Sequence, residues 1–254
     1  MSLRKVGYGS CPGCQGGGVV TLQVGLEWGP QGLRQLSERC DCVVIVDVLS
    51  FSTSVAVAVA RGAAVWPHSG SERAEELARA IGATLVRGRN MREGRTLSPA
   101  SLLDVEDGER LIMPSANGSV ISHAALMSGL TVVAGAMRNA SSVARWLSGR
   151  FATVGLVPAG EQWADGALRP CYEDLIGAGA IASRLRDLEL SADYSPDVLA
   201  AAAAFDQRGS LADVPSGQEL IERGFPEDVA LAQMVDVDPV VPVLCDGRYV
   251  DATD

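Results

Sequence analysis

One segment of the sequence constrains the fold more than any other. Residues 42–48 read Cys-Val-Val-Ile-Val-Asp-Val and are apolar almost without interruption. A strand with one solvent-facing side alternates apolar and polar residues, whereas a strand covered on both faces reads as a continuous apolar run. We therefore expect residues 42–48 to form a central strand that is buried on both faces.

Short β-branched runs and helical stretches alternate along the rest of the chain. Strands are predicted at 19–24, 42–48, 64–66, 110–113, 131–134 and 151–157. Helices are predicted at 32–39, 53–61, from 71, and at 117–127, 139–147, 171–186, 195–205, 217–223 and 226–235. This alternation is typical of a layered α/β/α fold with a mostly parallel or mixed sheet. The runs 240–244 and 248–250 flank Asp246-Gly247 and predict a C-terminal β-hairpin.

No linker composition occurs between residues 19 and 254. We therefore expect one α/β domain over 19–254, either as a single unit or as two tightly packed halves. The stretches 47–63 and 114–130 share the order of strand end, hydroxyl-rich turn and helix, which suggests an internal duplication.

Residues 1–18 are rich in glycine and lack periodicity, which predicts a flexible tail. Cys11 and Cys14 of this tail, with Cys40 and Cys42, invite a zinc interpretation. The second pair has one intervening residue rather than two, so ordinary thiols are the favoured interpretation.

The charge of the chain limits its partners. The formal net charge is −10, which argues against a nucleic-acid partner because such a protein needs a positive surface. An anionic substrate would need arginines or a bound divalent cation near the site. We expect a cytoplasmic protein without a membrane partner, since no apolar run could cross a bilayer and no signal-peptide pattern begins the chain. A homo-oligomer is compatible with the sequence.

Polar residues gather where predicted strands end and helices begin, which is where open α/β sheets bind ligands. These candidates are Asp47, Ser52, Thr53, Ser54, Asn117, Gly118, Ser119, Gly160, Glu173 and Asp174. Carboxylates there can hold a metal ion, and hydroxyls, amides and glycines can cradle an oxyanion. Each loop taken alone is also explained by helix capping.

A basic loop is the only dense positive cluster in the sequence. It holds Arg87, Arg89, Arg92 and Arg95. Guanidinium groups near the carboxylates would offer a fork for phosphate or sulfonate, although a solvated loop needs no such role.

Several short motifs occur in a fixed order. They are Val-Ile-Val-Asp47-Val-Leu with hydroxyls at 52–54, Asn117-Gly118-Ser119, Ala159-Gly160, Glu173-Asp174-Leu-Ile-Gly-Ala-Gly and Gly224-Phe-Pro-Glu-Asp228-Val. This ordered set, which spans residues 40–250, resembles the 2-phosphosulfolactate phosphatases. The resemblance implies a three-layer α/β fold, dependence on Mg²⁺, and hydrolysis of a phosphomonoester on a sulfonated three-carbon acid.

The resemblance also implies roles for the candidates. Asp47, Glu173 and Asp174 would hold Mg²⁺ or act as nucleophile or acid, and Asp228 is a further candidate metal ligand. Two mechanisms remain open. Asp47 could attack the phosphorus and form a phosphoenzyme, or metal-bound water could attack the phosphorus directly. The residues that would cradle the phosphoryl oxygens are Ser52, Thr53, Ser54, Asn117, Gly118, Ser119 and Gly160. Arg92 would hold the charged tail of the substrate.

One departure from the family pattern bears on the substrate. Ser50 stands where relatives usually carry an arginine that meets an anionic group. Either Arg92 or Arg138 supplies that charge, or the substrate has lost an anionic group, and we expect a phosphoester less anionic than phosphosulfolactate. The alternatives are a phosphatase for another small phosphoester and a non-catalytic anion-binding relative.

Overall fold

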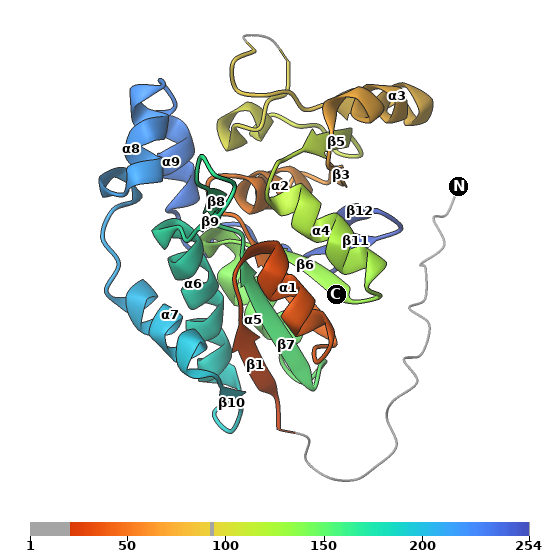
Figure 1. The fold of residues 1–254 in the computed structure, drawn as a ribbon. Coiled ribbons are helices and arrows are strands. Elements are labelled where there is room, and N and C mark those ends of the chain that lie inside the picture. Colours follow the sequence, from red (N-terminus) through yellow and green to blue (C-terminus); the bar gives the residue numbers. More distant parts are fainter. Residues whose placement is uncertain (1–20, 92–93, 254) are drawn as a thin grey trace.

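The computed structural model describes residues 21–91 and 94–253. The predicted tail 1–18 and the predicted substrate contact Arg92 lie outside the described residues. The described chain forms one large mixed sheet covered by helices (Figure 1). Within these two ranges, no helix has both the length and the apolar character needed to cross a membrane.

Ten strands of the described chain form the main sheet, in the order β10-β1-β7-β2-β6-β11-β12-β3-β5-β4. They are β1 (Gln23–Leu26), β2 (Cys42–Val46), β3 (Ala64–His68), β4 (Thr84–Leu85), β5 (Arg110–Pro114), β6 (Thr131–Gly135), β7 (Thr153–Pro158), β10 (Asp193–Tyr194), β11 (Pro242–Cys245) and β12 (Arg248–Asp251). A separate ladder joins β8 (Glu161–Gln162) to β9 (Leu168–Arg169). The layered α/β prediction is confirmed.

The apolar run that opened the sequence analysis is the strand β2, and its side chains explain the layering. β2 pairs in parallel with β6 on one side and with β7 on the other, and all five of its residues are buried. Val44 and Val46 belong to one hydrophobic cluster, whereas Val43 and Ile45 belong to another. Successive side chains of a strand point to opposite faces, so β2 feeds a core on each side of the sheet.

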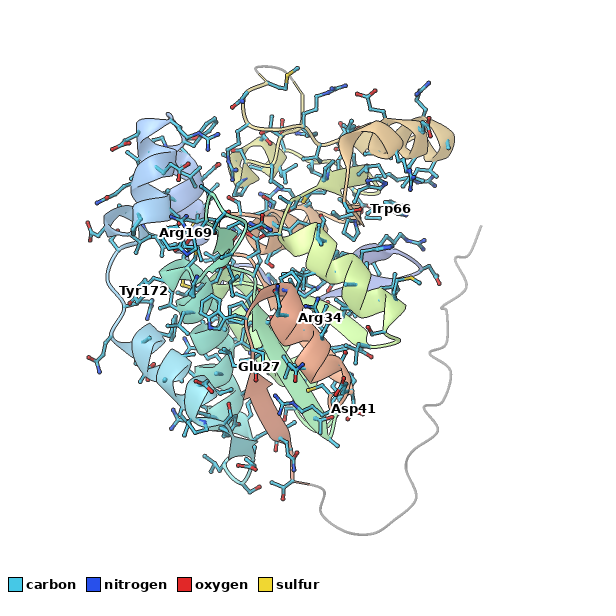
Figure 2. All side chains as sticks on the ribbon, viewed as in Figure 1. Glu27, Arg34, Asp41, Trp66, Arg169 and Tyr172 are labelled. Atoms are coloured by element: carbon cyan, nitrogen blue, oxygen red, sulfur yellow. The ribbon has the colours of Figure 1, made fainter. Side chains whose placement is uncertain are left out.

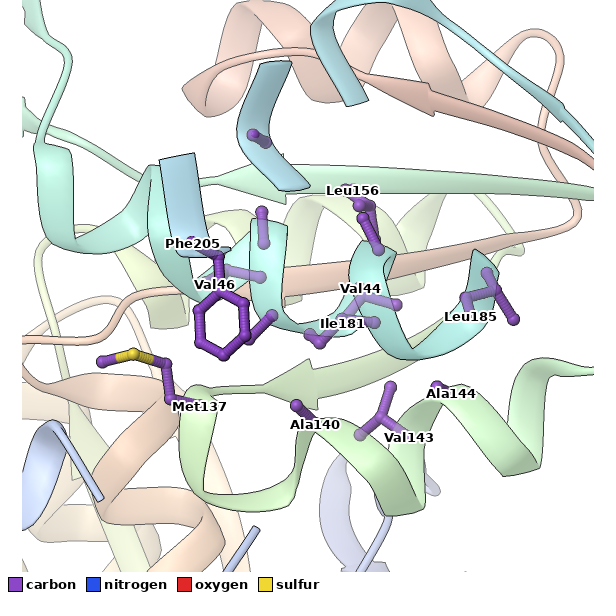
Figure 3. Close-up of a cluster of buried hydrophobic side chains, with 14 of the residues drawn as sticks. Val44, Val46, Met137, Ala140, Val143, Ala144, Leu156, Ile181, Leu185 and Phe205 are labelled. Atoms are coloured by element: carbon purple, nitrogen blue, oxygen red, sulfur yellow. The ribbon is translucent and has the colours of Figure 1, made fainter. Parts of the chain in front are cut away.

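Helices cover both faces of the sheet. In the described chain they are α1 (Gly29–Ser37), α2 (Phe51–Val59), α3 (Ser71–Ile81), α4 (Gly118–Met127), α5 (Ala140–Leu147), α6 (Tyr172–Leu188), α7 (Pro196–Asp206), α8 (Pro215–Glu222) and α9 (Pro226–Ala232), with 3₁₀ turns η1 (Pro99–Leu102), η2 (Met137–Asn139) and η3 (Leu211–Asp213). The cluster of Val44 and Val46 packs against α5, α6 and α7 (Figure 3). The cluster of Val43 and Ile45 packs against α1, α2 and α4.

The C-terminal hairpin forms as predicted, but it lies inside the sheet rather than at an edge. β11 pairs antiparallel with β6, and β12 pairs antiparallel with β3. It therefore joins a parallel block around β2 to a second parallel block of β3, β5 and β4. Each of these two pairings has a single matched pair, Val243 with Val133 and Tyr249 with Val65.

Two short pieces of sheet lie in segments for which the sequence predicts no strand. β10 follows α6, and the β8–β9 ladder occupies the segment between β7 and α6. Strands of two residues carry no readable alternation, since the period of a strand is itself two residues. The β8–β9 ladder matters below because it lies at the edge where the candidate site is found.

Candidate active site

The candidate residues lie at the carboxyl ends of parallel strands. Asp47 follows β2, Gly160 follows β7, and Asn117 follows β5 at the start of α4. The start of α6 and the β8–β9 hairpin reach the same edge of the sheet (Figure 1). Ligands of open α/β sheets bind at this edge, so the segments that the sequence singled out are brought together.

The carboxylate of Asp47 joins the starts of two helices. Its Oδ1 accepts the backbone N–H of Phe51 at 3.1 Å, at the start of α2. Its Oδ2 accepts the backbone N–H of Gly118 at 3.0 Å, at the start of α4. Asp47 is only 6% exposed. The side chain therefore satisfies helix N–H groups that would otherwise lack an acceptor.

Asp174 makes a matching link between two strand-end loops. Its Oδ1 accepts the N–H of Val48 at 2.7 Å, and its Oδ2 accepts the N–H of Gly160 at 2.8 Å. Asp174 lies in the first turn of α6 and is buried. Together, Asp47 and Asp174 fix the positions of the loops after β2 and β7 and of the helices α2, α4 and α6.

Negative charge is concentrated here with little hydration. Burial raises the pKa of Asp47 to about 6, and the charge of Glu161 adds to this rise, while its backbone hydrogen bonds and Arg89 oppose it. Burial, followed by the charges of Asp47 and Glu173, raises the pKa of Asp174 well above its usual value. Burial and like charges both disfavour ionisation. A bound cation would relieve this repulsion.

Glu173 is the one buried carboxylate of this group without a partner in the described chain. It is 3% exposed, and no hydrogen bond or ion pair to another described residue satisfies it. No set of three or more His, Cys, Asp or Glu side chains among the described residues is arranged to enclose a metal ion. The oxygens of Asp47 and Asp174 already accept N–H groups, so Glu173 offers the freest oxygens among the three buried carboxylates Asp47, Glu173 and Asp174.

Asp228, the fourth predicted metal ligand, is engaged by other residues. It is buried and pairs with Arg89, whose Nε lies 2.9 Å from its Oδ2. Its Oδ1 accepts the hydroxyl of Ser98. Both carboxylate oxygens are thus occupied by a salt bridge and a hydrogen bond.

Arg89 is a site residue that the sequence did not single out from its loop. Its Nη2 donates to the hydroxyl of Ser50, and its side chain is 11% exposed. Its positive charge also opposes the raised pKa of Asp47. A guanidinium therefore does reach Ser50, from Arg89. The only signal in the sequence was the dense basic cluster, which does not distinguish Arg89 from its neighbours.

Arg138, the other arginine considered for this role, is committed elsewhere. It is buried, and its Nε and Nη2 donate to the two oxygens of Asp238 at 2.6 and 3.0 Å. Its Nη1 donates to the carbonyl of Leu231 at 2.8 Å. This two-pronged pairing leaves it no free donor pair for a substrate.

The four hydroxyls predicted to cradle a phosphate are all fully buried. They belong to Ser52, Thr53, Ser54 and Ser119. Their hydroxyls donate, in that order, to the carbonyl oxygens of Ile45, Val48, Leu97 and Met113. These bonds give the hydroxyls a structural part in the loops, because the donors point into the protein rather than toward a ligand.

Gly118 and Asn117 occupy different environments. A Cβ atom at Gly118 would lie 2.2 Å from Cδ1 of Phe51 and 2.9 Å from Oδ2 of Asp47, so only glycine fits. Asn117 lines a small cavity of about 90 Å³ together with Glu161. A wider surface hollow of about 480 Å³ beside Arg145 has no carboxylate in its lining. Of these two, the cavity next to Asn117 is the one with a carboxylate of the site, Glu161, in its lining.

One known protein family matches most of the length of this chain. Residues 30–247 match the model of the 2-phosphosulpholactate phosphatase family. The chain belongs to this family. A relative from Carboxydothermus hydrogenoformans, named a probable 2-phosphosulfolactate phosphatase, is 32% identical over 232 residues, covering 87% of this chain and 93% of the relative. A second, from Gloeothece citriformis and with the same name, is 29% identical over 222 residues, covering 80% of this chain and 88% of the relative.

The family match includes every carboxylate of the site. Asp47, Glu161, Glu173, Asp174 and Asp228 all fall within the matched residues. The ordered motifs in the sequence predicted this family, and the match confirms that prediction.

Proposed function

We propose that this chain hydrolyses the phosphoester of 2-phosphosulfolactate or of a closely similar small phosphorylated acid, with Mg²⁺ as its cofactor. The family match and the names of both relatives support the reaction and the substrate class. The observation that carries the role of the metal ion is Glu173, a buried carboxylate without a partner in the described chain, next to the buried Asp174.

The residues fit Mg²⁺ by their chemistry. Mg²⁺ prefers oxygen ligands, keeps several waters, and is usually held by one or two carboxylates plus the phosphate of the substrate. Such a site needs no enclosing set of three side chains, so it agrees with the arrangement of the described carboxylates. Glu173 would supply the main ligand, with Asp174 or Asp47 adding a second. When bound, the ion would neutralise phosphate charge that the acidic site would otherwise repel.

The loops around the ion have separate tasks in this proposal. Asp47 and Asp174 hold the loops after β2 and β7 by accepting backbone N–H groups. Asn117, in the cavity shared with Glu161, would donate its amide to an oxygen of the phosphoryl group. Asp228 would position Arg89 rather than bind the ion.

Arg89 changes the expectation for the substrate. The serine at position 50 suggested that an anion-binding arginine had been lost and that the substrate had lost an anionic group. Because Arg89 brings a guanidinium to the Ser50 hydroxyl, the site keeps a positive group at that place. We therefore propose a substrate with its full set of anionic groups.

The test is phosphate release by the full chain from 2-phosphosulfolactate and from phosphoglycolate, with Mg²⁺ and with excess chelator. We expect release from 2-phosphosulfolactate with Mg²⁺, and none with chelator until the ion is restored. Release from neither ester under any divalent cation would refute the proposed function. Release that persists undiminished in chelator would refute the role of the ion alone.

A further inference from the structure

Arg169, at the end of β9, is half-buried and differs from the two paired arginines described above. Its Nε is buried and has no hydrogen-bond partner in the described chain. Arg89 and Arg138, in contrast, each pair with a buried aspartate. A buried donor without an acceptor destabilises a protein, and a charged donor does so more strongly. A donor left in this state indicates an acceptor that the protein itself does not supply.

Arg169 belongs to the same edge of the site as the carboxylates. Its cross-strand partner in the β8–β9 ladder is Glu161, and directly paired residues project from the same face of a ladder. Glu161 lines the cavity that also holds Asn117. No ion pair joins Arg169 to Glu161 in the described chain, although they are direct partners. The guanidinium therefore projects from the same ladder face as Glu161 and is bound to no described carboxylate.

The β8–β9 hairpin packs against the loop after β7, which Asp174 holds in place. A Cβ atom at Gly160 would lie 2.8 Å from the carbonyl oxygen of Arg169, and Gly160 has a φ of +65°. The N–H of Gly160 donates to Asp174. Glycine thus allows the backbone of Arg169 to approach Gly160, whose N–H is held by Asp174. Figure 2 labels Arg169 at this hairpin, near Tyr172 at the start of α6.

A tryptophan positions the guanidinium without satisfying its donors. The ring of Trp163 lies 5.5 Å from the Cζ of Arg169, within the range of a cation–π contact. Trp163 is itself 55% exposed, so it forms the outer wall of the hairpin. A ring face attracts the charge but accepts no N–H hydrogen bond of normal strength. The donors of Arg169 stay available for an oxyanion.

We propose that Arg169 binds the acid group of the substrate that is not hydrolysed, a carboxylate or a sulfonate. This inference rests on the proposed function and names the residue that selects for the acid tail. Arg89 is fixed by Asp228 and lies beside Ser50 at the start of α2. Arg169 approaches from the opposite loop, across Gly160. Two guanidinium groups on two loops suit a substrate with a phosphate at one end and an acid group at the other.

The experiment compares Arg169→Gln with the unmodified chain on 2-phosphosulfolactate and on p-nitrophenyl phosphate, an ester without an acid group. The loss of a charged hydrogen-bonded contact should raise KM for 2-phosphosulfolactate about ten- to a hundredfold. Turnover of p-nitrophenyl phosphate should be unchanged. Arg39→Gln, which removes an exposed arginine whose partner is Glu27, is the matched control and should alter neither reaction.

Binding of sulfolactate, which lacks the phosphate, gives a readout that is independent of hydrolysis. Calorimetry should show binding to the unmodified chain and about ten- to a hundredfold weaker binding to Arg169→Gln. Equal losses on both esters, or unchanged sulfolactate binding, would overturn the assignment of Arg169. If the unmodified chain binds sulfolactate through Arg169 but hydrolyses neither ester, the assignment stands and the proposed function fails. If the unmodified chain hydrolyses 2-phosphosulfolactate and Arg169→Gln leaves its KM unchanged, the proposed function stands and the assignment of Arg169 fails.

Discussion

Replacing Asp47 with asparagine measures the electrostatic cost of the buried acidic group. Burial raises the pKa of Asp47 from 3.8 to about 6. A carboxyl with a raised folded-state pKa stabilises the fold below its unfolded pKa, and this contribution is lost as the pH rises through the folded pKa. The gap corresponds to about 3 kcal/mol, because each pH unit is worth roughly 1.4 kcal/mol. Above about pH 6, ionised Asp47 therefore lowers the free energy of unfolding.

Asparagine removes this pH dependence but also removes a hydrogen bond. Its amide has one acceptor oxygen, whereas Asp47 accepts N–H groups from both Phe51 and Gly118. The unmet N–H costs about 1–3 kcal/mol at every pH. Asp47→Asn should therefore be less stable than the unmodified chain near pH 4, and should gain on it by about 2–3 kcal/mol as the pH rises to about 7.

The assay is urea unfolding followed by circular dichroism, at a series of pH values and in the presence of chelator. The informative quantity is the difference in unfolding free energy between the two proteins at each pH. Asp187→Asn, at an exposed position on α6, is the control for the same carboxylate-to-amide change outside the site. A difference for Asp47→Asn that does not vary with pH would refute a raised pKa for Asp47.

Two further substitutions test other contacts of the site. In Gly118→Ala, the new Cβ would overlap Phe51 and the Asp47 carboxylate. We therefore expect urea unfolding to show that the free energy of unfolding falls by about 1–3 kcal/mol, and phosphatase activity should be lost as well. Unchanged stability would contradict the close packing at Gly118. Arg89→Ala leaves Asp228 buried without its partner, which should cost about 3–5 kcal/mol in thermal unfolding. Adding Asp228→Asn should recover much of that loss, and no recovery would show that Arg89 acts through other contacts.

Much of the fold could be predicted because its elements carry strong local signals. The continuous apolar run of β2 gave its place between two helical layers, and the turn residues Asp246-Gly247 gave the C-terminal hairpin. The position of that hairpin between β6 and β3 could not be predicted, because a strand's sequence does not name its partners. Single matched pairs such as Tyr249 with Val65 leave no pattern in the chain.

The candidate site was predictable in its location but less so in its contacts. Strand ends and helix starts are visible in sequence, so Asp47 and Asp174 were found together at one edge. The hydroxyls of Ser52 and Thr53 match a phosphate cradle in type, yet each meets a backbone carbonyl that only the folded loop brings close. Arg89 reaches Ser50 from 39 residues away, a contact that no local spacing encodes.

The Mg²⁺ dependence of phosphate release from 2-phosphosulfolactate, measured for the unmodified chain and for Glu173→Gln, tests the proposed site most directly. Glutamine keeps the shape of the side chain but lacks the charge that binds the ion. We expect the unmodified chain to be inactive in chelator and to saturate with Mg²⁺, and Glu173→Gln to need at least about tenfold more Mg²⁺ for half-maximal release. The exposed Glu38→Gln should behave like the unmodified chain. Full activity in chelator, or the same Mg²⁺ requirement in Glu173→Gln, would contradict a metal ion held by Glu173.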